Sequence, residues 1–223
     1  MGSAATVAAS SILSKVLYEL NDRDGSNYNP DGTYAELLGY LNRCLEIIHQ
    51  VLVDEESELV RTGTGTFNTV AGTQSYDLST RSMGDLWAIH RVWLSEYEPM
   101  EMCEEEDLYD AINQNEGSNI SRAQPEEYCL IGDYLWFREV PDAVYPVNIR
   151  YFPNFVALTA TTSTMPYKNL FNNECIEGVK ILAKHRNEIG VQVDAQLKDI
   201  FFARAMQIVR KRRTKNVRVT VRM

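Results

Sequence analysis

The sequence predicts an α+β protein: a helical bundle of about four helices, a β-rich subdomain inserted into it, and an extended C-terminal arm. Hydrophobic residues recur at helical spacing up to about residue 56, change to short alternating segments, and return to helical spacing beyond about residue 156. The C-terminal residues combine a basic cluster with an alternating apolar pattern. We therefore expect a helical domain in two parts, 1–56 and 156–209, an inserted subdomain, 57–155, and a basic arm, 210–223.

The first two helices are separated by a turn-rich loop. In the segment 10–20 the apolar residues fall on one stripe of a helix. The segment 21–32 is rich in Asn, Asp and Gly, which favour turns. Thr33 and Glu36 then fit a capping box, and apolar residues follow every three or four positions as far as Leu52. These observations predict a second helix that begins just after Thr33.

The inserted subdomain is predicted to contain about six strands. Its segments are rich in Thr, Val, Tyr and Trp and are broken by Gly, Asn and Pro. Gly132 and Asp133 separate two of them as a two-residue hairpin turn. The acidic run 104–107 starts a short helix between strands. The strands are expected at 59–67, 74–78, 87–94, 128–131, 134–138 and 147–152.

Two further helices complete the helical domain. Asn172 or Asn173 can cap a third long helix, and Gly190 can terminate it. A fourth helix follows from Asp194, with apolar residues on one face as far as Ile208. Because amphipathic helices of this length are marginal in isolation, the four are expected to pack together as one bundle.

Composition excludes several classes of protein. The 223 residues are 44% hydrophobic and 24% charged, as in ordinary globular proteins. No stretch approaches the ~20 consecutive apolar residues that cross a bilayer, and the first residues lack the pattern of a signal peptide. None of the four cysteines forms a CxxC pair, so we expect buried thiols in a reducing cytoplasm and no zinc site or disulfide. The chain is expected to need no metal, cofactor or membrane.

The net charge of −9 combines an acidic body with a basic end. The last twenty residues contain eight Lys and Arg and no acid, which leaves fourteen bases against thirty-one acids, or −17, in the remainder. Residues 217–222 alternate apolar and polar side chains at the strand period. A solvated tail is the simpler interpretation, but the alternation favours an arm that docks on a partner. Its partner-binding residues are predicted to be Arg210, Lys211, Arg212, Arg213, Lys215, Arg218 and Arg222.

No catalytic motif is found. The sequence lacks GxSxG, HExxH, Walker, GxGxxG and EF-hand patterns. The run 63–66 (GTGT) lacks the Lys and helix start of a phosphate loop, so a plain strand is the better interpretation. His49, His90 and His185 are scattered over different elements and are not expected to converge on a metal. The acids 104–107 are interpreted as a solvated helix start, not as a cation site. We therefore predict no catalytic, cofactor-binding or metal-binding residues.

Several segments follow one another in a recognisable order: the turn and helix ending in Leu41-Asn42, then 72–78, 87–92, 125–128, Gly132, 135–137, 141–147, 150–151 and 165–167. This order resembles that of bacteriophage head-to-tail adaptor proteins. The segments cover roughly residues 12–190, so the basic arm lies beyond the resemblance.

This resemblance implies a structural, non-enzymatic protein with a helical core and a β-sandwich-like insertion. It implies assembly as a closed homo-oligomeric ring, typically a dodecamer, through which genomic DNA passes without specific binding. The expected partners are the portal protein, gripped by the C-terminal segment, and a tail tube or nozzle protein on the other face. The expected location is the head–tail junction of the virion, and the host cytoplasm during assembly.

Two other classes of function stay open. A nucleic-acid-binding module would use the cluster 210–213 on phosphates, against the repulsion of the acidic body. A sugar-binding tail component or glycosidase would stack sugars on Trp87, Trp93 and Trp136. A glycosidase would also place two carboxyl groups ~5–9.5 Å apart across a cleft.

Overall fold

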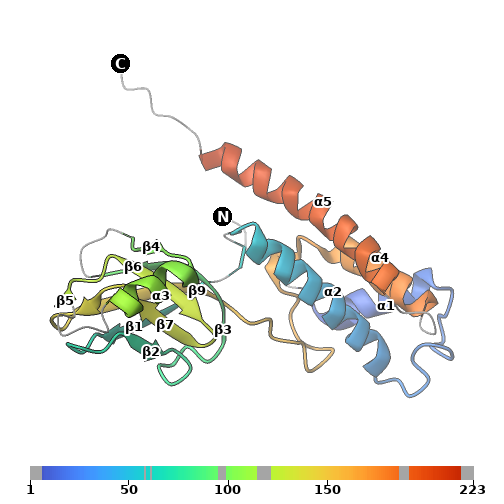
Figure 1. Ribbon diagram of the computed structural model, residues 1–223. Helices are drawn as coiled ribbons and strands as arrows, with labels where there is room; N and C mark the ends of the chain where they lie inside the picture. The colour runs from blue at the N-terminus through green and yellow to red at the C-terminus, as the bar shows by residue number, and fades with distance from the viewer. Residues whose placement is uncertain are drawn as a thin grey trace. The chain divides into compact units, whose positions relative to one another are not determined.

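The computed structural model describes residues 7–57, 59–60, 62–94, 99–114, 122–185 and 191–216, and confirms a mixed α+β protein (Figure 1). Its described residues form five α-helices and several small sheets. They fall into two compact units: unit 1 within Met1–Val60 and Phe155–Met223, and unit 2 within Arg61–Asn154. None of the helices in the described ranges is long and apolar enough to cross a bilayer.

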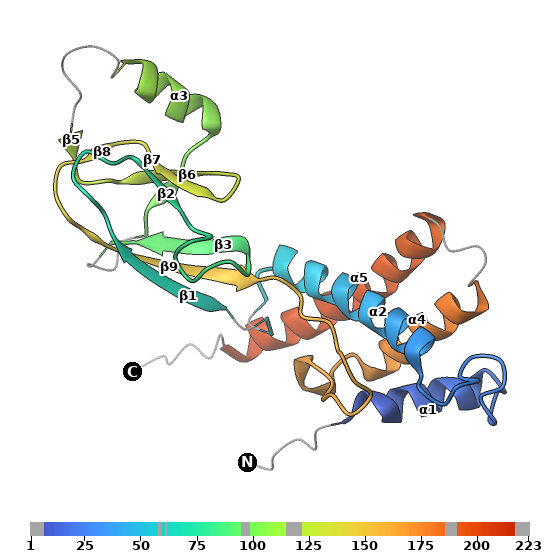
Figure 2. The same cartoon turned by 90° about the horizontal axis from the view of Figure 1, so that it is seen from below.

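Unit 1 contains four long helices. They are α1 (Ala9–Glu19), α2 (Ala35–Asp54), α4 (Asn172–Lys184) and α5 (Val191–Asn216), with the 3-10 turn η1 (Tyr167–Asn169) before α4. The central helix α2 packs against α4 and α5, and α1 packs against α4 (Figure 2). The predicted helices in this unit are therefore present, and their apolar stripes are buried, as Leu41 and Leu45 of α2 illustrate.

Helix α4 approaches its neighbours most closely at Gly178. A Cβ atom on this residue would lie 2.7 Å from Cys44 Sγ of α2 and 2.9 Å from Phe201 Cζ of α5. Both neighbours are fully buried. Burial raises the pKa of the Cys44 thiol to about 12, so it packs as a small neutral side chain. The absence of a side chain at Gly178 is what allows three helices to meet here.

The predicted capping box of α2 is wrong. The cap position is Tyr34, in the left-handed region with φ of 59°, and its side chain makes no capping hydrogen bond. The Thr33 hydroxyl accepts from the amide of Ala35 at 3.3 Å, not from the amide of Glu36. The Thr33 hydroxyl instead donates to Asp31 Oδ2 at 2.7 Å, and the Glu36 carboxylate accepts from the Tyr40 hydroxyl at 2.7 Å. Both predicted partners are therefore engaged locally, Thr33 in the preceding turn and Glu36 along the helix surface.

The predicted cap of α4 is also wrong. Asn172 and Asn173 are already helical, and the cap position is Phe171, which makes no side-chain capping hydrogen bond. The Phe171 side chain is buried and meets the Tyr167 ring edge-on. Apolar packing after η1 thus sets the start of this helix. The helix ends before Gly190, which lies outside the described residues.

Unit 2 contains the strands and one helix. A three-stranded antiparallel sheet has the order β1-β9-β3, a four-stranded sheet has the order β2-β7-β6-β4, and β5 pairs with β8. The elements are β1 (Gly63–Asn68), β2 (Ser75–Asp77), β3 (Leu86–Trp93), β4 (Glu101–Met102), α3 (Glu105–Gln114), β5 (Arg122–Ala123), β6 (Glu127–Ile131), β7 (Tyr134–Phe137), β8 (Val140–Pro141) and β9 (Pro146–Pro153).

All six predicted strands are present, although the first begins at Gly63 instead of residue 59. The hairpin at Gly132 and Asp133 is confirmed, because Ile131 pairs with Tyr134 and Gly132 has a positive φ of 59°. The strands β4, β5 and β8 were not predicted. Two residues are too few to display a period, so the sequence pattern carries no signal for them.

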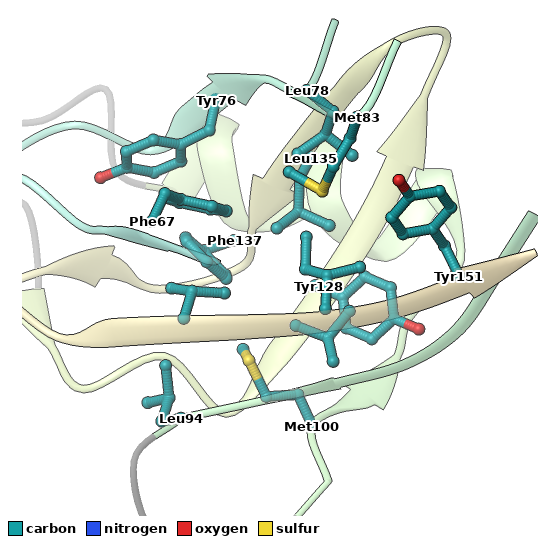
Figure 3. Close-up of a cluster of buried hydrophobic side chains, with 13 residues drawn as sticks. Phe67, Tyr76, Leu78, Met83, Leu94, Met100, Tyr128, Leu135, Phe137 and Tyr151 are labelled. Carbon is teal, nitrogen blue, oxygen red and sulfur yellow. The ribbon is translucent and has the colours of Figure 1, made fainter. Parts of the chain in front are cut away.

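The two larger sheets of unit 2 share one hydrophobic cluster, shown in Figure 3. Figure 2 shows α3, the four-stranded sheet and the three-stranded sheet as successive layers of this unit. Side chains alternate along each strand, so every second residue enters the cluster. The strand residues in the cluster are Phe67, Tyr76, Val92, Tyr128, Leu135, Phe137, Val147, Ile149 and Tyr151.

The GTGT run is a strand, as predicted, and its glycines have a packing role. Gly63 and Gly65 lie in β1 on the face that also carries the buried Phe67. A Cβ on Gly63 would overlap the Tyr151 ring, and one on Gly65 would overlap the Met83 side chain. The two glycines therefore make room for large side chains of the cluster and do not form a phosphate-binding loop.

The loop between α1 and α2 is organised by a buried carboxylate. Asp22 is 3% exposed and accepts hydrogen bonds from the backbone amides of Tyr28 at 2.9 Å and Asn27 at 3.2 Å, and from the Ser26 hydroxyl at 3.3 Å. Burial alone would raise the pKa of Asp22, but these hydrogen bonds outweigh it and lower the pKa below its ordinary value. The charged form therefore holds the loop.

Gly178→Ala is expected to destabilise the protein by about 1–3 kcal/mol, because the new methyl group would force α2 and α5 away from α4. The matched control is Gly39→Ala in α2, where an added Cβ meets nothing within 4 Å. That substitution should stabilise by about 0.5–1 kcal/mol, the helix-propensity gain of Ala over Gly. Thermal unfolding of both variants checks this, and equal shifts would contradict the close contact.

Asp22→Asn is expected to lower the melting temperature at neutral pH, since Asn cannot supply a charged acceptor to four donors. The lowered pKa of Asp22 means that its stabilisation is complete above the unfolded-state pKa of about 3.9 and is lost as the pH falls through the folded-state value. The gap between wild type and variant should therefore close in acid. Melting curves from neutral to acid pH measure it, with the exposed Asp24→Asn as control.

Candidate functional site

The C-terminal helix α5 is anchored within unit 1 by buried side chains between Leu197 and Ile208. Its buried side chains come from one face and end at Ile208. Arg204 Nε lies 3.1 Å from Glu174 Oε1 of α4, which adds an ion pair to the apolar contact. The backbone of α5 continues for two more turns, to Asn216. The buried residues are Leu197, Phe201, Ala205 and Ile208.

The predicted extended arm is wrong in its first half, because 210–216 belongs to α5. This run contains no Gly or Pro and is rich in Lys and Arg, which are good helix formers and favour the negative end of the helix dipole. The structure places Arg210, Lys211, Arg212, Arg213 and Lys215 on these last turns and describes only their backbone. The predicted residues Arg218 and Arg222 lie outside the described residues.

Helix α5 also carries apolar side chains away from its buried face. Phe202 is 48% exposed and Ile200 is partly exposed, although each flanks the fully buried Phe201. A helix with apolar residues on more than one side can bury the second set against another molecule. The described part of α5 is therefore a candidate interaction surface, next to the predicted basic residues.

A second candidate surface is a tip of unit 2 formed by two loops, 68–74 and 142–146. Thr69 is 1% exposed and joins them. Its hydroxyl donates to the carbonyl of Ala143 at 3.0 Å and accepts from the amide of Tyr145 at 2.7 Å. The Thr69 amide also donates to the carbonyl of Tyr145 at 2.9 Å. One buried threonine thus holds both loops in a single conformation.

The first loop is further held by Tyr76 of β2. The Tyr76 hydroxyl donates to the carbonyl of Thr73 at 2.8 Å and accepts from the amide of Val70 at 2.9 Å. Burial raises the pKa of Tyr76, so this hydroxyl keeps its proton. The same ring packs against Phe67 and Phe137 in the cluster. The tip is therefore continuous with the hydrophobic core of unit 2.

Both loops of this tip present valines to solvent: Val70 is 57% exposed and Val144 is 64% exposed. Binding residues are disproportionately found on loops held by a rigid scaffold, so this tip is a candidate interaction surface. Isolated exposed valines have no sequence pattern, so neither valine was predicted as a binding residue. The segments 72–78 and 141–147, which include Tyr76 and Val144, were singled out only for the resemblance.

The three tryptophans do not form a common sugar-binding surface. Trp87 and Trp93 lie on β3 of the three-stranded sheet, whereas Trp136 lies on β7 of the four-stranded sheet. Trp87 is 51% exposed, and the Trp93 ring lies beneath the Arg91 guanidinium, 5.9 Å from its centroid. The stacking platform that a carbohydrate-binding protein needs is therefore not assembled from these residues.

The histidines, thiols and acids lie in ordinary structural positions. The His49 Nδ1 atom lies 3.0 Å from the Tyr167 hydroxyl, the His90 ring packs on Phe152, and His185 is the C-terminal cap of α4. All four cysteines are free thiols. The acids 104–107 are exposed at the start of α3. Within the described ranges, no three His, Cys, Asp or Glu side chains gather as a metal site.

The candidate sites of this two-unit α+β protein are exposed surfaces on α5 and at the tip of unit 2, which suit contacts with other proteins. The family model described as SU10 adaptor protein matches residues 7–222, almost the whole chain. The chain therefore belongs to this family of bacteriophage adaptor proteins, which confirms the resemblance seen in the sequence. No curated protein matches it.

Membership of this family gives a structural role in the virion, in association with other head and tail proteins of the phage. It favours a non-enzymatic protein. The candidate site is accordingly a set of protein-binding surfaces: the exposed side of α5 with its basic C-terminal turns, and the tip of unit 2.

Thr69→Val is expected to destabilise unit 2 by about 1–3 kcal/mol, because it keeps the shape of the side chain but leaves the Tyr145 amide without its acceptor. Proteolysis should then cut within 68–74 or 142–146, where the wild type resists. Thr66→Val, at an exposed position of β1, is the control and should leave both properties unchanged. Equal protease resistance in all three proteins would show that Thr69 does not hold the tip.

Proposed function

We propose that this chain is a structural subunit of the ring that joins the portal of a tailed phage to its tail and forms part of the DNA channel. The observation that carries the proposal is the match of nearly the whole chain to an adaptor family. The proposed copy number is that of a dodecamer, and the proposed partners are the portal protein and a tail tube or nozzle protein. The proposed place is the head–tail junction, with assembly in the host cytoplasm.

The charge of the chain supports a channel role. Outside its last twenty residues the chain carries −17. Each phosphate neutralised by a protein releases counterions and adds affinity, which would slow DNA in transit. An acidic body avoids such contacts. DNA is therefore proposed to pass through without specific binding.

We further propose that the helical bundle, the insertion and the C-terminal arm have different roles in the subunit. The four long helices would act as one bundle, from 1–56 and 156–209, and the two larger sheets as a sandwich-like insertion, 57–155. The segment 210–223 would be the arm that binds the portal. Different surfaces on the two units suit a head-to-tail ring, in which each subunit must present two different faces to its neighbours.

The helical start of the arm supports a contact with an acidic surface. Charged side chains on a formed helix lose less conformational freedom on binding than those on a coil. Charge-assisted hydrogen bonds from Arg to carboxylates would add affinity and orientation. A nucleic-acid-binding module is the competing function, because phosphates would attract the same residues. The sugar-binding function has no support, since the tryptophans lie on different sheets.

Negative-stain imaging of the purified protein, alone and mixed with its portal, tests the ring. Rings in the first sample, or caps on portals in the second, are the expected result. Isolated subunits in both samples would refute the proposal.

Deleting 210–223 is expected to abolish portal binding and leave the fold intact, because every α5 side chain described as buried lies before this segment. The melting temperature should change little and duplex DNA affinity should stay weak. A matched variant replaces Arg210, Lys211, Arg212 and Arg213 by Gln, which keeps helix propensity but removes charge. A truncated protein that still caps portals but loses DNA binding would favour the nucleic-acid function instead.

A further inference from the structure

We infer that the outer edge of β1 receives the segment 217–222 of a second copy of this chain as an added strand. The inference rests on the proposed ring and assigns one of the contacts between its subunits. The acceptor is β1 (Gly63–Asn68), and the donor is the alternating segment V-R-V-T-V-R. The portal contact proposed for the arm then rests on the basic turns 210–216, which precede this segment.

Strand β1 forms one edge of the three-stranded sheet, which has the order β1-β9-β3 (Figure 2). Just beyond β1, the Thr69 amide donates to the carbonyl of Tyr145, the residue before β9. The β1–β9 register has no interruption, and hydrogen-bonded pairs alternate along an antiparallel ladder. Every second residue of β1 therefore points its amide and carbonyl away from β9. These residues are Thr64, Thr66 and Asn68, and the side chains of all three are exposed.

The outward backbone groups of β1 are open to a partner. Within the described ranges they make no hydrogen bond to the backbone of a loop or of another strand. A row of outward amides and carbonyls at the edge of a sheet is a template for one more strand. Main-chain hydrogen bonds along such an edge supply the affinity when a protein binds an extended segment. The edge of β1 is therefore a site for strand addition.

The other edge strands of unit 2 are poorer sites than β1. Strand β3 has register shifts at two places, and its Val92 carbonyl already accepts from the amide of Met100. The strands β2, β4, β5 and β8 have at most three residues each. In contrast, β1 has six residues in one continuous register, without a charged residue, a proline or a bulge. Those are the features by which proteins keep edge strands from pairing, so β1 is built to accept a strand.

The sequence of the segment 217–222 fits this edge. It has six residues, as β1 has, and three valines alternate with Arg, Thr and Arg. Val and Thr favour strands, and side chains alternate between the two faces of a sheet. The valines can therefore share the face of β1 that carries the buried Phe67. The arginines and Thr220 then lie on the outer face, beside the exposed Thr64 and Thr66.

Charge and symmetry favour the segment of a second copy as the occupant. Residues 61–154 contain six Arg, no Lys and sixteen acids, so unit 2 carries −10, whereas 217–222 carries two Arg and no acid. This difference in charge attracts the segment toward unit 2. Each subunit also offers one edge and one strand, which are two different surfaces. Pairing between copies is therefore head to tail, and such a contact can repeat until a ring closes.

Cross-linking between two variants of the full-length protein tests the inference. Thr66→Cys marks the edge and Thr220→Cys marks the strand, both with Cys103→Ser, since the other three cysteines are buried. The two variants, one with a mass tag, are mixed before assembly and treated with a short bismaleimide where wild type forms rings. The expected product is a covalent heterodimer, and neither variant alone should form a dimer. Asp133→Cys, at the exposed hairpin of the other sheet, replaces Thr66→Cys in the control mixture and should give no heterodimer.

A second variant blocks the edge. Thr66→Pro removes an amide that points away from β9, so it leaves the hydrogen bonds between β1 and β9 in place. Its ring formation, measured by mass photometry with portal present, is expected to need several-fold more protein than that of wild type. Thr66→Val keeps the amide and should assemble like wild type. Circular dichroism checks that both variants fold, and the cross-linking result stands alone if Thr66→Pro does not.

The outcomes separate this inference from the proposed function. Wild type without rings, alone and with portal, refutes the proposed ring. Wild-type rings without the heterodimer overturn the strand addition and leave the ring intact, and so does unimpaired assembly of a folded Thr66→Pro variant. A chain with both Thr66→Cys and Thr220→Cys that is cross-linked only within itself would assign the edge to its own C-terminal segment. A product that joins Thr66→Cys to the portal would assign the edge to the portal. Either product in place of the heterodimer overturns the inference.

Discussion

The architecture depends on the pairing of the first and last strands of the insertion. In the β1–β9 register Gly63 lies opposite Tyr151, so the chain enters and leaves unit 2 at neighbouring points. A helical unit made of two distant parts of the sequence can form only if its intervening segment begins and ends close together. The same strand β9 also pairs with β3 and carries Val147 and Ile149 into the cluster, so the strand that closes the insertion also contributes to its core. The loop-closure entropy of this long segment is offset by that core.

The elements that could be predicted from the sequence are those whose pattern repeats. Leu41, Leu45 and Ile48 predict α2 because apolar residues at this spacing form one face of a helix. The six longer strands are predicted by the alternation of apolar and polar residues. The helix caps were predicted wrongly for a different reason: Thr33 has a competing partner in the preceding turn, Asp31, and residue type alone does not decide between the two arrangements. The start of α4 is set by burial of Phe171, a tertiary contact that local sequence does not contain.

The candidate surfaces were predicted less completely than the fold. The basic residues near the C-terminus are evident from the composition. Their helix propensity favours the continuation of α5 to Asn216, but the alternating pattern beyond residue 216 favoured an extended arm instead. Thr69 could not be identified, because its importance lies in partners more than seventy residues away.

The state of the cysteines bears on the chemical durability of the particle. Burial raises the pKa of all four thiols, and that of Cys44 reaches about 12, so almost no thiolate exists at physiological pH. The thiolate is the species that reacts with oxidants and that attacks disulfides. A released phage meets oxygen without any cellular reductant to repair it. By keeping its sulfur protonated, and packed in the core at Cys44, Cys129 and Cys175, the adaptor can persist outside a host without protective disulfides and without the cross-linking that free thiols would otherwise invite.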